Sequence, residues 1–214
     1  MIKIIDKLCL DKTGLVVKGT KQLVHLQQGS MDGACAVYSL MMCLIICRAI
    51  KRADVTSLAT KHDKRFSKGR LVNHFLNKNG MVLEGYYISQ LRDELNHAFL
   101  KEIQTEYHSL ENGPLIKNII DALDNNNAVE IKFLRPTSGH MVVAIGYEKI
   151  DNHVQLFCLD PGFPLLEGQY WNNIIDIDAT STSKYNCRNY NEKGRVLIDE
   201  ILIVKKRQKK RQKK

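Results

Sequence analysis

The stretch HLQQGSMDGACAVYSLMMCLIICRAI, residues 25–50, changes from a polar, glycine-containing segment to an almost wholly apolar one. Apolar residues recur in it at helical spacing, and the other faces are also uncharged: Val37, Leu40, Met41, Leu44 and Ile45. A helix that is apolar on every side is buried at the centre of a protein. We therefore expect a central helix from about Gly33 to Cys47, with Ser30 or Asp32 as its N-cap.

Cys35 lies in the first turn of this helix, where a thiol has two possible roles. Unpaired backbone N–H groups and the positive end of the helix dipole favour a thiolate, the nucleophilic form of cysteine. The alternative is a small buried hydrophobic residue, as we expect for Cys43 and Cys47 in the middle of the helix. Position alone leaves both roles open for Cys35.

A cysteine nucleophile needs a base, and His140 is the best candidate among the seven histidines. It follows the turn-forming residues 136–139 and begins the strand-like run 141–147, so it lies at the edge of a core. The other histidines lie in polar or amphipathic stretches, and we expect them to face water: His25, His62, His74, His97, His108 and His153.

Asp160 is the candidate third member of the site. The runs 141–147 and 154–159 are expected to form a hairpin that turns near residues 150–152, which makes their outer ends neighbours. His140 and Asp160 stand at those ends, so the carboxylate can hold one imidazole nitrogen while the other nitrogen faces a thiol. Taken alone, the Asp-Pro-Gly sequence is an ordinary turn.

Gln28 precedes Cys35 by seven residues. Attack of a thiol on a carbonyl carbon develops a negatively charged oxygen, which a side-chain amide and the backbone N–H of the cysteine can stabilise. We therefore predict that Gln28 contributes to an oxyanion hole; the alternative is a solvated glutamine in a loop.

After the central helix, the residue pattern of the chain is first helical and then changes to short strand-like runs. Residues from about 54 to 101 and from 114 to 123 have helical, amphipathic patterns. Short β-rich runs separated by turn residues follow them: Ala128–Leu134, Met141–Tyr147, Val154–Leu159 and Arg195–Val204. Helices followed by an antiparallel sheet indicate an α+β fold rather than an alternating α/β fold.

The formal charge of +9 is concentrated at one end of the chain of 214 residues. The last ten residues, KKRQKKRQKK at 205–214, carry eight positive charges, and without them 24 basic residues face 23 acidic ones. We predict one domain over residues 1–204, helical over about 30–125 and sheet over about 127–204, followed by a disordered basic tail. That tail can be a solvated charge run, a weak contact for polyanions such as nucleic acid or anionic lipid, or a nuclear address.

The six cysteines show no repeated spacing, which predicts free thiols in a reducing compartment rather than a disulfide framework. The first residues, MIKIIDKLCLDK, are too charged for a signal peptide. The apolar run 33–47 spans about 22 Å as a helix, which is too short to cross a bilayer. We expect a cytoplasmic protein, with secretion by a leaderless route as the alternative.

The run QGSMDGACAVYS, residues 28–39, resembles the nucleophile segment of papain-like cysteine peptidases. It is most similar to bacterial branches related to the C39 bacteriocin-processing peptidases, and SGHMVVAIGYE and LFCLDPG are similar to their histidine and aspartate segments. The resemblance implies a papain-like fold, with an N-terminal helical lobe whose central helix carries the nucleophile and a C-terminal antiparallel β-sheet lobe. The chain departs from papain in two ways: Gln28 is one residue farther from the cysteine, and Ala36 replaces an aromatic residue.

These residues predict a thiol hydrolase that cleaves peptide or isopeptide bonds of a protein or peptide substrate. Cys35 attacks, His140 carries the proton, Asp160 orients His140, and Gln28 with the Cys35 backbone N–H stabilises the oxyanion. We expect no cofactor and no metal. A deamidase, a transglutaminase or an acyltransferase would use the same residues, and a catalytically inactive adaptor that binds nucleic acid or membrane through residues 205–214 is the alternative from another class.

Overall fold

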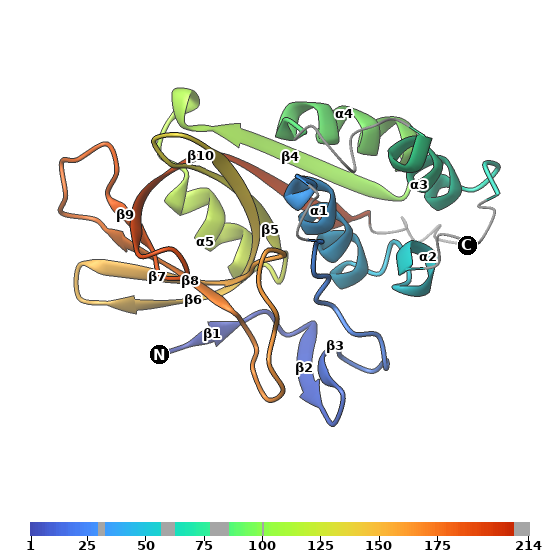
Figure 1. Ribbon diagram of the computed structural model, residues 1–214, viewed down its shortest axis with the longest axis horizontal. Helices are drawn as coiled ribbons and strands as arrows, with labels where there is room; N and C mark the ends of the chain where they lie inside the picture. Colours follow the sequence, from blue (N-terminus) through green and yellow to red (C-terminus); the bar gives the residue numbers. More distant parts are fainter. Residues whose placement is uncertain (30–32, 57–62, 78–85, 100, 208–214) are drawn as a thin grey trace, which may run out of the picture.

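The structure is a computed structural model and describes residues 1–29, 33–56, 63–77, 86–99 and 101–207. Its central element is the helix α1 (Cys35–Ile46), which is buried on nearly every side (Figure 1). The prediction of a central apolar helix is therefore confirmed. The predicted N-cap is wrong, because Ala34 occupies that position and makes no side-chain capping hydrogen bond. Ser30 and Asp32 themselves lie outside the described residues.

In the part of the chain that the structure describes, an antiparallel sheet of eight strands packs beside α1 (Figure 1). The strands are β1 (Lys3–Ile4), β4 (Ile103–Ser109), β5 (Val129–Leu134), β6 (Gly139–Ile150), β7 (His153–Leu159), β8 (Asn173–Asp178), β9 (Cys187–Asn189) and β10 (Gly194–Lys206). The strands β6-β5-β10-β9-β8-β7 close into a ring, because β6 pairs with β5 along one edge and with β7 along the other. Because β6 and β7 are the two arms of a hairpin, the start of β6 lies near the end of β7.

The remaining elements cover α1 and the sheet. The helices α2 (Ala53–Thr56), α3 (Ser67–Asn77) and α4 (Ile88–Phe99) lie beside α1, on the side away from β7, β8 and β9 (Figure 1). The helix α5 (Ile116–Asp124) follows a 3₁₀ turn at Leu110–Asn112 and packs a buried face on β5 and β6. A separate hairpin consists of β2 (Leu8–Asp11) and β3 (Gly14–Val17).

The predicted strands of the second half are present as β5, β6, β7 and β10, and the antiparallel α+β class is confirmed. The sequence pattern does not indicate β4, β8 or β9, and β4 falls inside the part that we expected to be helical. Strand β4 alternates only weakly between buried and exposed residues, and it exists because β10 supplies its hydrogen-bonding partners.

The basic tail begins later than predicted. Lys205 and Lys206 belong to β10 and pair with β4, and Lys205 Nζ lies 2.6 Å from Glu106 Oε1. The backbone N–H of Arg207 donates to the carbonyl of Glu102 at 2.9 Å. The prediction of disorder from residue 205 is thus wrong for these first residues, while residues 208–214 lie outside the described part.

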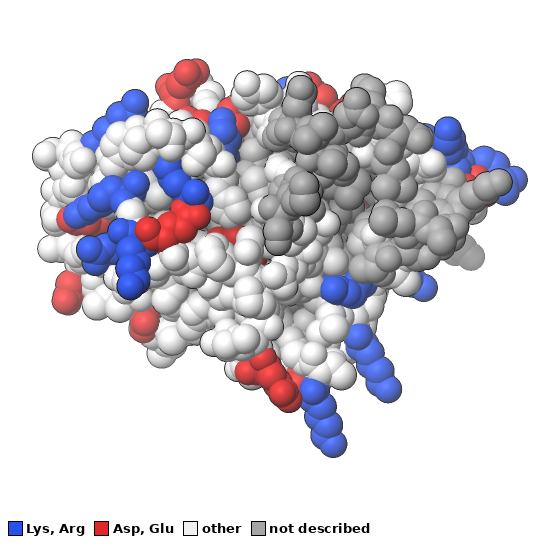
Figure 2. All heavy atoms as spheres, viewed as in Figure 1, with Lys and Arg blue, Asp and Glu red and all other residues white. Residues whose placement is uncertain are grey.

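Charged side chains of both signs are mixed over the face shown in Figure 2, in keeping with the near-neutral charge of residues 1–204. Within the described residues, no helix combines the length and the apolar character needed to cross a membrane.

Candidate active site

Cys35 is the first residue of α1, and its thiol is partly exposed. Cys9 is also partly exposed, whereas the other cysteines are buried: Cys43, Cys47, Cys158 and Cys187. Burial raises the pKa of the Cys43 and Cys47 thiols, which favours their protonated, unreactive form. The prediction that these two residues belong to the core is confirmed.

The hairpin of β6 and β7 brings His140 and Asp160 together, as predicted. Ile150 pairs with His153 at the turn, and His140 Nε2 lies 2.7 Å from Asp160 Oδ1 at the other end. The His140 ring also interacts with the Cys35 side chain through a hydrogen bond. Thiol, imidazole and carboxylate therefore form one continuous chain of contacts.

The electrostatics of this chain favour a charged imidazole. Burial lowers the pKa of His140, but the hydrogen bonds and negative charges of Asp160 and Cys35 outweigh burial and raise the pKa from 6.5 to about 9. The ring packs edge-on against Phe133, with centroids 5.5 Å apart, which limits its movement. At neutral pH, His140 therefore holds a proton that it can donate to a leaving group.

Asp160 is almost fully buried, and both of its carboxylate oxygens accept hydrogen bonds. Oδ1 accepts from His140 and from the backbone N–H of Gly162 at 2.8 Å. Oδ2 accepts from Asn173 Nδ2 at 3.0 Å and from Asn191 Nδ2 at 3.4 Å. Burial raises the pKa of Asp160, but the His140 charge and these hydrogen bonds lower it below its ordinary value of 3.8. The carboxylate is thus ionised and held in one orientation.

The backbone of Asp160 is fixed by Asn172 and His25. Asn172 Oδ1 accepts from the Asp160 N–H at 2.7 Å, and Asn172 Nδ2 donates to the Asp160 carbonyl at 2.8 Å. His25 Nε2 lies 3.0 Å from the same carbonyl oxygen. The prediction that His25 faces water is therefore wrong: His25 packs against the Asp160 turn, and burial lowers its pKa.

Gln28 is tied to the same turn. Its backbone N–H donates to the carbonyl of Pro161 at 2.9 Å. Its side-chain oxygen Oε1 is buried and has no hydrogen-bond partner in the part of the chain that the structure describes. The fold thus brings the Gln28 backbone to the residue that follows Asp160, and its contribution to an oxyanion hole stays a prediction.

Glu130 is a buried acid near the site that the sequence analysis missed. It lies in β5 between Val143 of β6 and Leu202 of β10, and it is fully buried. Neither of its carboxylate oxygens has a hydrogen-bond partner among the described residues. Burial, and to a smaller extent the negative charge of Cys35, raises its pKa well above 4.5, which favours the neutral acid. The sequence signal that could have identified Glu130 is that it is the single acidic residue in the apolar run Ala128–Leu134.

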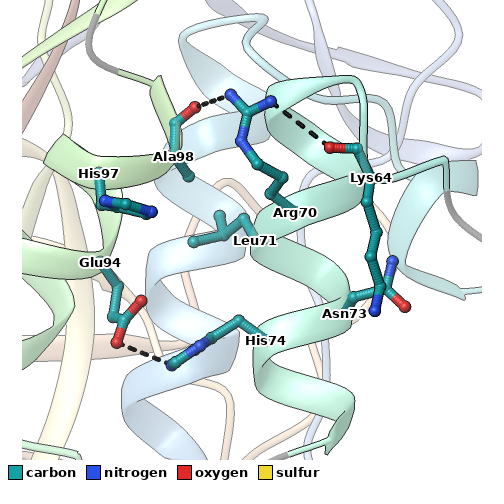
Figure 3. A pocket seen from close by; sticks show the side chains of 8 residues that line it. All are labelled: Lys64, Arg70, Leu71, Asn73, His74, Glu94, His97 and Ala98. Atoms are coloured by element: carbon teal, nitrogen blue, oxygen red, sulfur yellow. Dashed lines mark hydrogen bonds and ion pairs between the residues drawn. The ribbon is translucent and has the colours of Figure 1, made fainter.

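A second hollow lies between α3 and α4, apart from these residues (Figure 3). His74, which we expected to face water, is partly buried there, with its Nε2 2.8 Å from Glu94 Oε1. Arg70 donates to the carbonyls of Ala98 at 2.8 Å and Lys64 at 3.5 Å, so its guanidinium links the two helices. This hollow shares no residue with the Cys35–His140–Asp160 chain. His62 lies outside the described residues.

Comparisons with known proteins agree with the geometry. The model of the peptidase C39-like family matches residues 15–195, a range that includes the candidate residues Gln28, Cys35, His140 and Asp160. No curated protein matches the chain significantly. Because the family model covers most of the chain, the chain belongs to the peptidase C39-like family of cysteine peptidases.

Proposed function

We propose that this protein is a papain-like thiol hydrolase that cleaves peptide or isopeptide bonds with Cys35, His140 and Asp160. The observation that carries the proposal is the continuous chain of contacts from the Cys35 thiol through the His140 ring to the buried Asp160 carboxylate. In papain-like terms, α1 belongs to the helical lobe and the ring of strands to the sheet lobe.

The first half of the reaction transfers the acyl group of the substrate to the enzyme. Cys35 Sγ attacks the carbonyl carbon, and the oxyanion is stabilised by the Cys35 backbone N–H and the side-chain amide of Gln28. His140 then donates its proton to the leaving nitrogen as the C–N bond breaks, which leaves a thioester on Cys35 and a neutral imidazole. Asp160 keeps the His140 ring in the orientation that both steps require.

The second half releases the acyl group. A water molecule attacks the thioester carbon while the neutral His140 accepts one of its protons. Collapse of the intermediate breaks the C–S bond, releases a carboxylic acid and leaves the Cys35 thiolate beside the protonated His140, the pair that begins the next cycle. An amine in place of water would give the acyl transfer of a transglutaminase or an acyltransferase. A side-chain amide in place of the peptide bond, still with water as the acceptor, would give a deamidase that releases ammonia.

Labelling with an electrophilic peptide probe tests the proposal. The probe carries a group that alkylates thiols only after binding, and mass spectrometry locates the modified residue. We expect Cys35 to be modified and Cys9, the other partly exposed thiol, to stay free. Cys9→Ser is the matched control, because it removes the competing thiol and should leave both labelling and peptide hydrolysis unchanged. Labelling of Cys9 instead, or hydrolysis that survives Cys35→Ala, would contradict the proposal.

A further inference from the structure

A pocket of about 430 Å³ is lined in part by the amide side chains that hold Asp160. Its walls come from the segment after β7, from the start of β8 and from the turn after β9: Phe163, Leu166, Trp171, Asn173, Tyr190 and Asn191. Its volume lies in the range of roughly 300–1,000 Å³ that is typical of ligand pockets.

The pocket adjoins the candidate active site. Asn173 and Asn191 line it, and the same two side chains donate to Asp160 Oδ2 at 3.0 Å and 3.4 Å. The opposite oxygen of that carboxylate, Oδ1, lies 2.7 Å from His140 Nε2. A group bound in the pocket is thus separated from the His140–Asp160 pair by a single layer of amide side chains.

The other wall of the pocket is apolar. Trp171 stacks on Phe157, with ring centroids 4.1 Å apart and planes 22° apart, so its ring is held in place. Leu166 is 61% exposed and Tyr190 is 43% exposed, so both present apolar surface to water beside the Trp171 ring. A rigid aromatic ring, exposed apolar side chains and a few fixed amides favour an apolar group with a peptide backbone attached.

We propose that this pocket, which we call the Trp171 pocket, receives a large apolar side chain of the substrate on the leaving-group side of the cleaved bond. The inference rests on the proposed function. His140 donates its proton to the leaving nitrogen, so the leaving part of the substrate extends past His140 toward Asp160 and the amides behind it. The primary amides of Asn172, Asn173 and Asn191 are neutral, so the Trp171 pocket selects by size and apolar character rather than by charge.

Trp171 is the single tryptophan of the chain, so its fluorescence reports on the pocket directly. The experiment uses full-length Cys35→Ala protein, which binds without turnover, and two blocked pentapeptides without tryptophan that differ only in phenylalanine or alanine at one position. Excitation is at the red edge of tryptophan absorption, where the peptides do not absorb. We expect a saturable change in Trp171 emission and binding at least about tenfold tighter for the phenylalanine peptide, since a pocket of this kind discriminates by the apolar area that it buries.

Two variants test where the peptide binds. Leu166→Ser should weaken binding of the phenylalanine peptide several-fold with little effect on folding, because Leu166 is largely exposed. Leu110→Ser is the matched control: Leu110 is also an exposed leucine, at 38%, and does not line the Trp171 pocket. Equal affinity for both peptides, no change in Trp171 emission, or equal losses in the two variants would overturn the inference.

Hydrolysis by the wild-type protein separates this inference from the proposed function. Among cleaved peptides, phenylalanine on the carboxyl side of the cut should lower KM about tenfold relative to alanine there. A preference found only on the amino side overturns the placement of the pocket, while the proposed hydrolase stands. Selective binding to Cys35→Ala together with a complete lack of hydrolysis leaves the Trp171 pocket in place and contradicts the hydrolase instead.

Discussion

Replacing Asp160 with asparagine removes one negative charge from the site and keeps the shape of the side chain. Asp160 is almost fully buried and His140 is mostly buried, so solvent screens their interaction little. The pKa of His140 is raised from 6.5 to about 9, a difference equivalent to about 3 kcal/mol of stabilisation of the imidazolium. Burial lowers the pKa of His140, and Asp160 and Cys35 raise it. Once the Asp160 charge is removed, Cys35 is the one remaining cause of this shift that opposes burial.

We therefore expect the alkaline limb of the pH profile of kcat/KM to shift to lower pH in Asp160→Asn. In the wild-type protein the rate should fall as His140 loses its proton near pH 9. In Asp160→Asn this fall should begin about 2 pH units lower, because the neutral amide stabilises the imidazolium much less than a carboxylate does. The assay is the pH dependence of hydrolysis of a fluorogenic peptide. The variant Asp160→Ala also lacks the hydrogen-bond acceptor, so it should lower kcat further than Asp160→Asn does, without a matching rise in KM.

Stability gives a second measurement of the same interaction. Because the pKa of His140 is higher in the folded state, its contribution is fully present below pH 6.5 and is lost as the pH rises through about 9. The difference in unfolding free energy between wild type and Asp160→Asn, measured by urea denaturation, should therefore be about 3 kcal/mol at pH 6 and shrink toward pH 10. An alkaline limb that stays near pH 9 in Asp160→Asn, or a difference in stability that does not vary with pH, would refute this reasoning.

Three further predictions concern the thiol, the buried acid and the tail. Cys35→Ala should abolish turnover and leave the melting temperature nearly unchanged, because Cys35 is partly exposed; a loss of the roughly 2–5 kcal/mol typical of core truncations in urea denaturation would mark a structural thiol instead. Glu130→Gln should increase stability more at pH 8 than at pH 5, because an acid whose pKa is raised in the folded state destabilises it increasingly as the pH rises above 4.5; equal effects at both pH values, by urea denaturation, would argue that Glu130 is ionised. Deletion of residues 208–214, which carry basic residues beyond the end of β10, should weaken salt-dependent binding of heparin or nucleic acid and preserve peptide hydrolysis; unchanged binding in a filter assay would place the basic surface elsewhere.

The sequence by itself determined the parts of this protein that depend on local pattern. The apolar run after Gly33 has no charged face, so its burial as α1 follows from its composition. The alternating runs on either side of residues 150–152 pair as β6 and β7, and this hairpin brings the strand end that carries His140 close to the strand end that precedes Asp160. Cys35 could be placed at a helix start for the same reason, since the change from polar to apolar residues marks the boundary of the helix.

Only the tertiary structure decided what surrounds those residues. His25, Asn173 and Asn191 come from three separate segments. They meet at Asp160 because β8 pairs with both β7 and β9, and because the segment before α1 lies against the Asp160 turn. Contacts of this kind depend on long-range strand pairing, which leaves no periodic signal in the chain. Glu130 illustrates the same limit: its pattern is that of a strand, but its burial follows from α1 packing over β5. Contacts between distant segments therefore determine the charge and rigidity of the site, while the local sequence pattern determines the helices and strands that carry its residues.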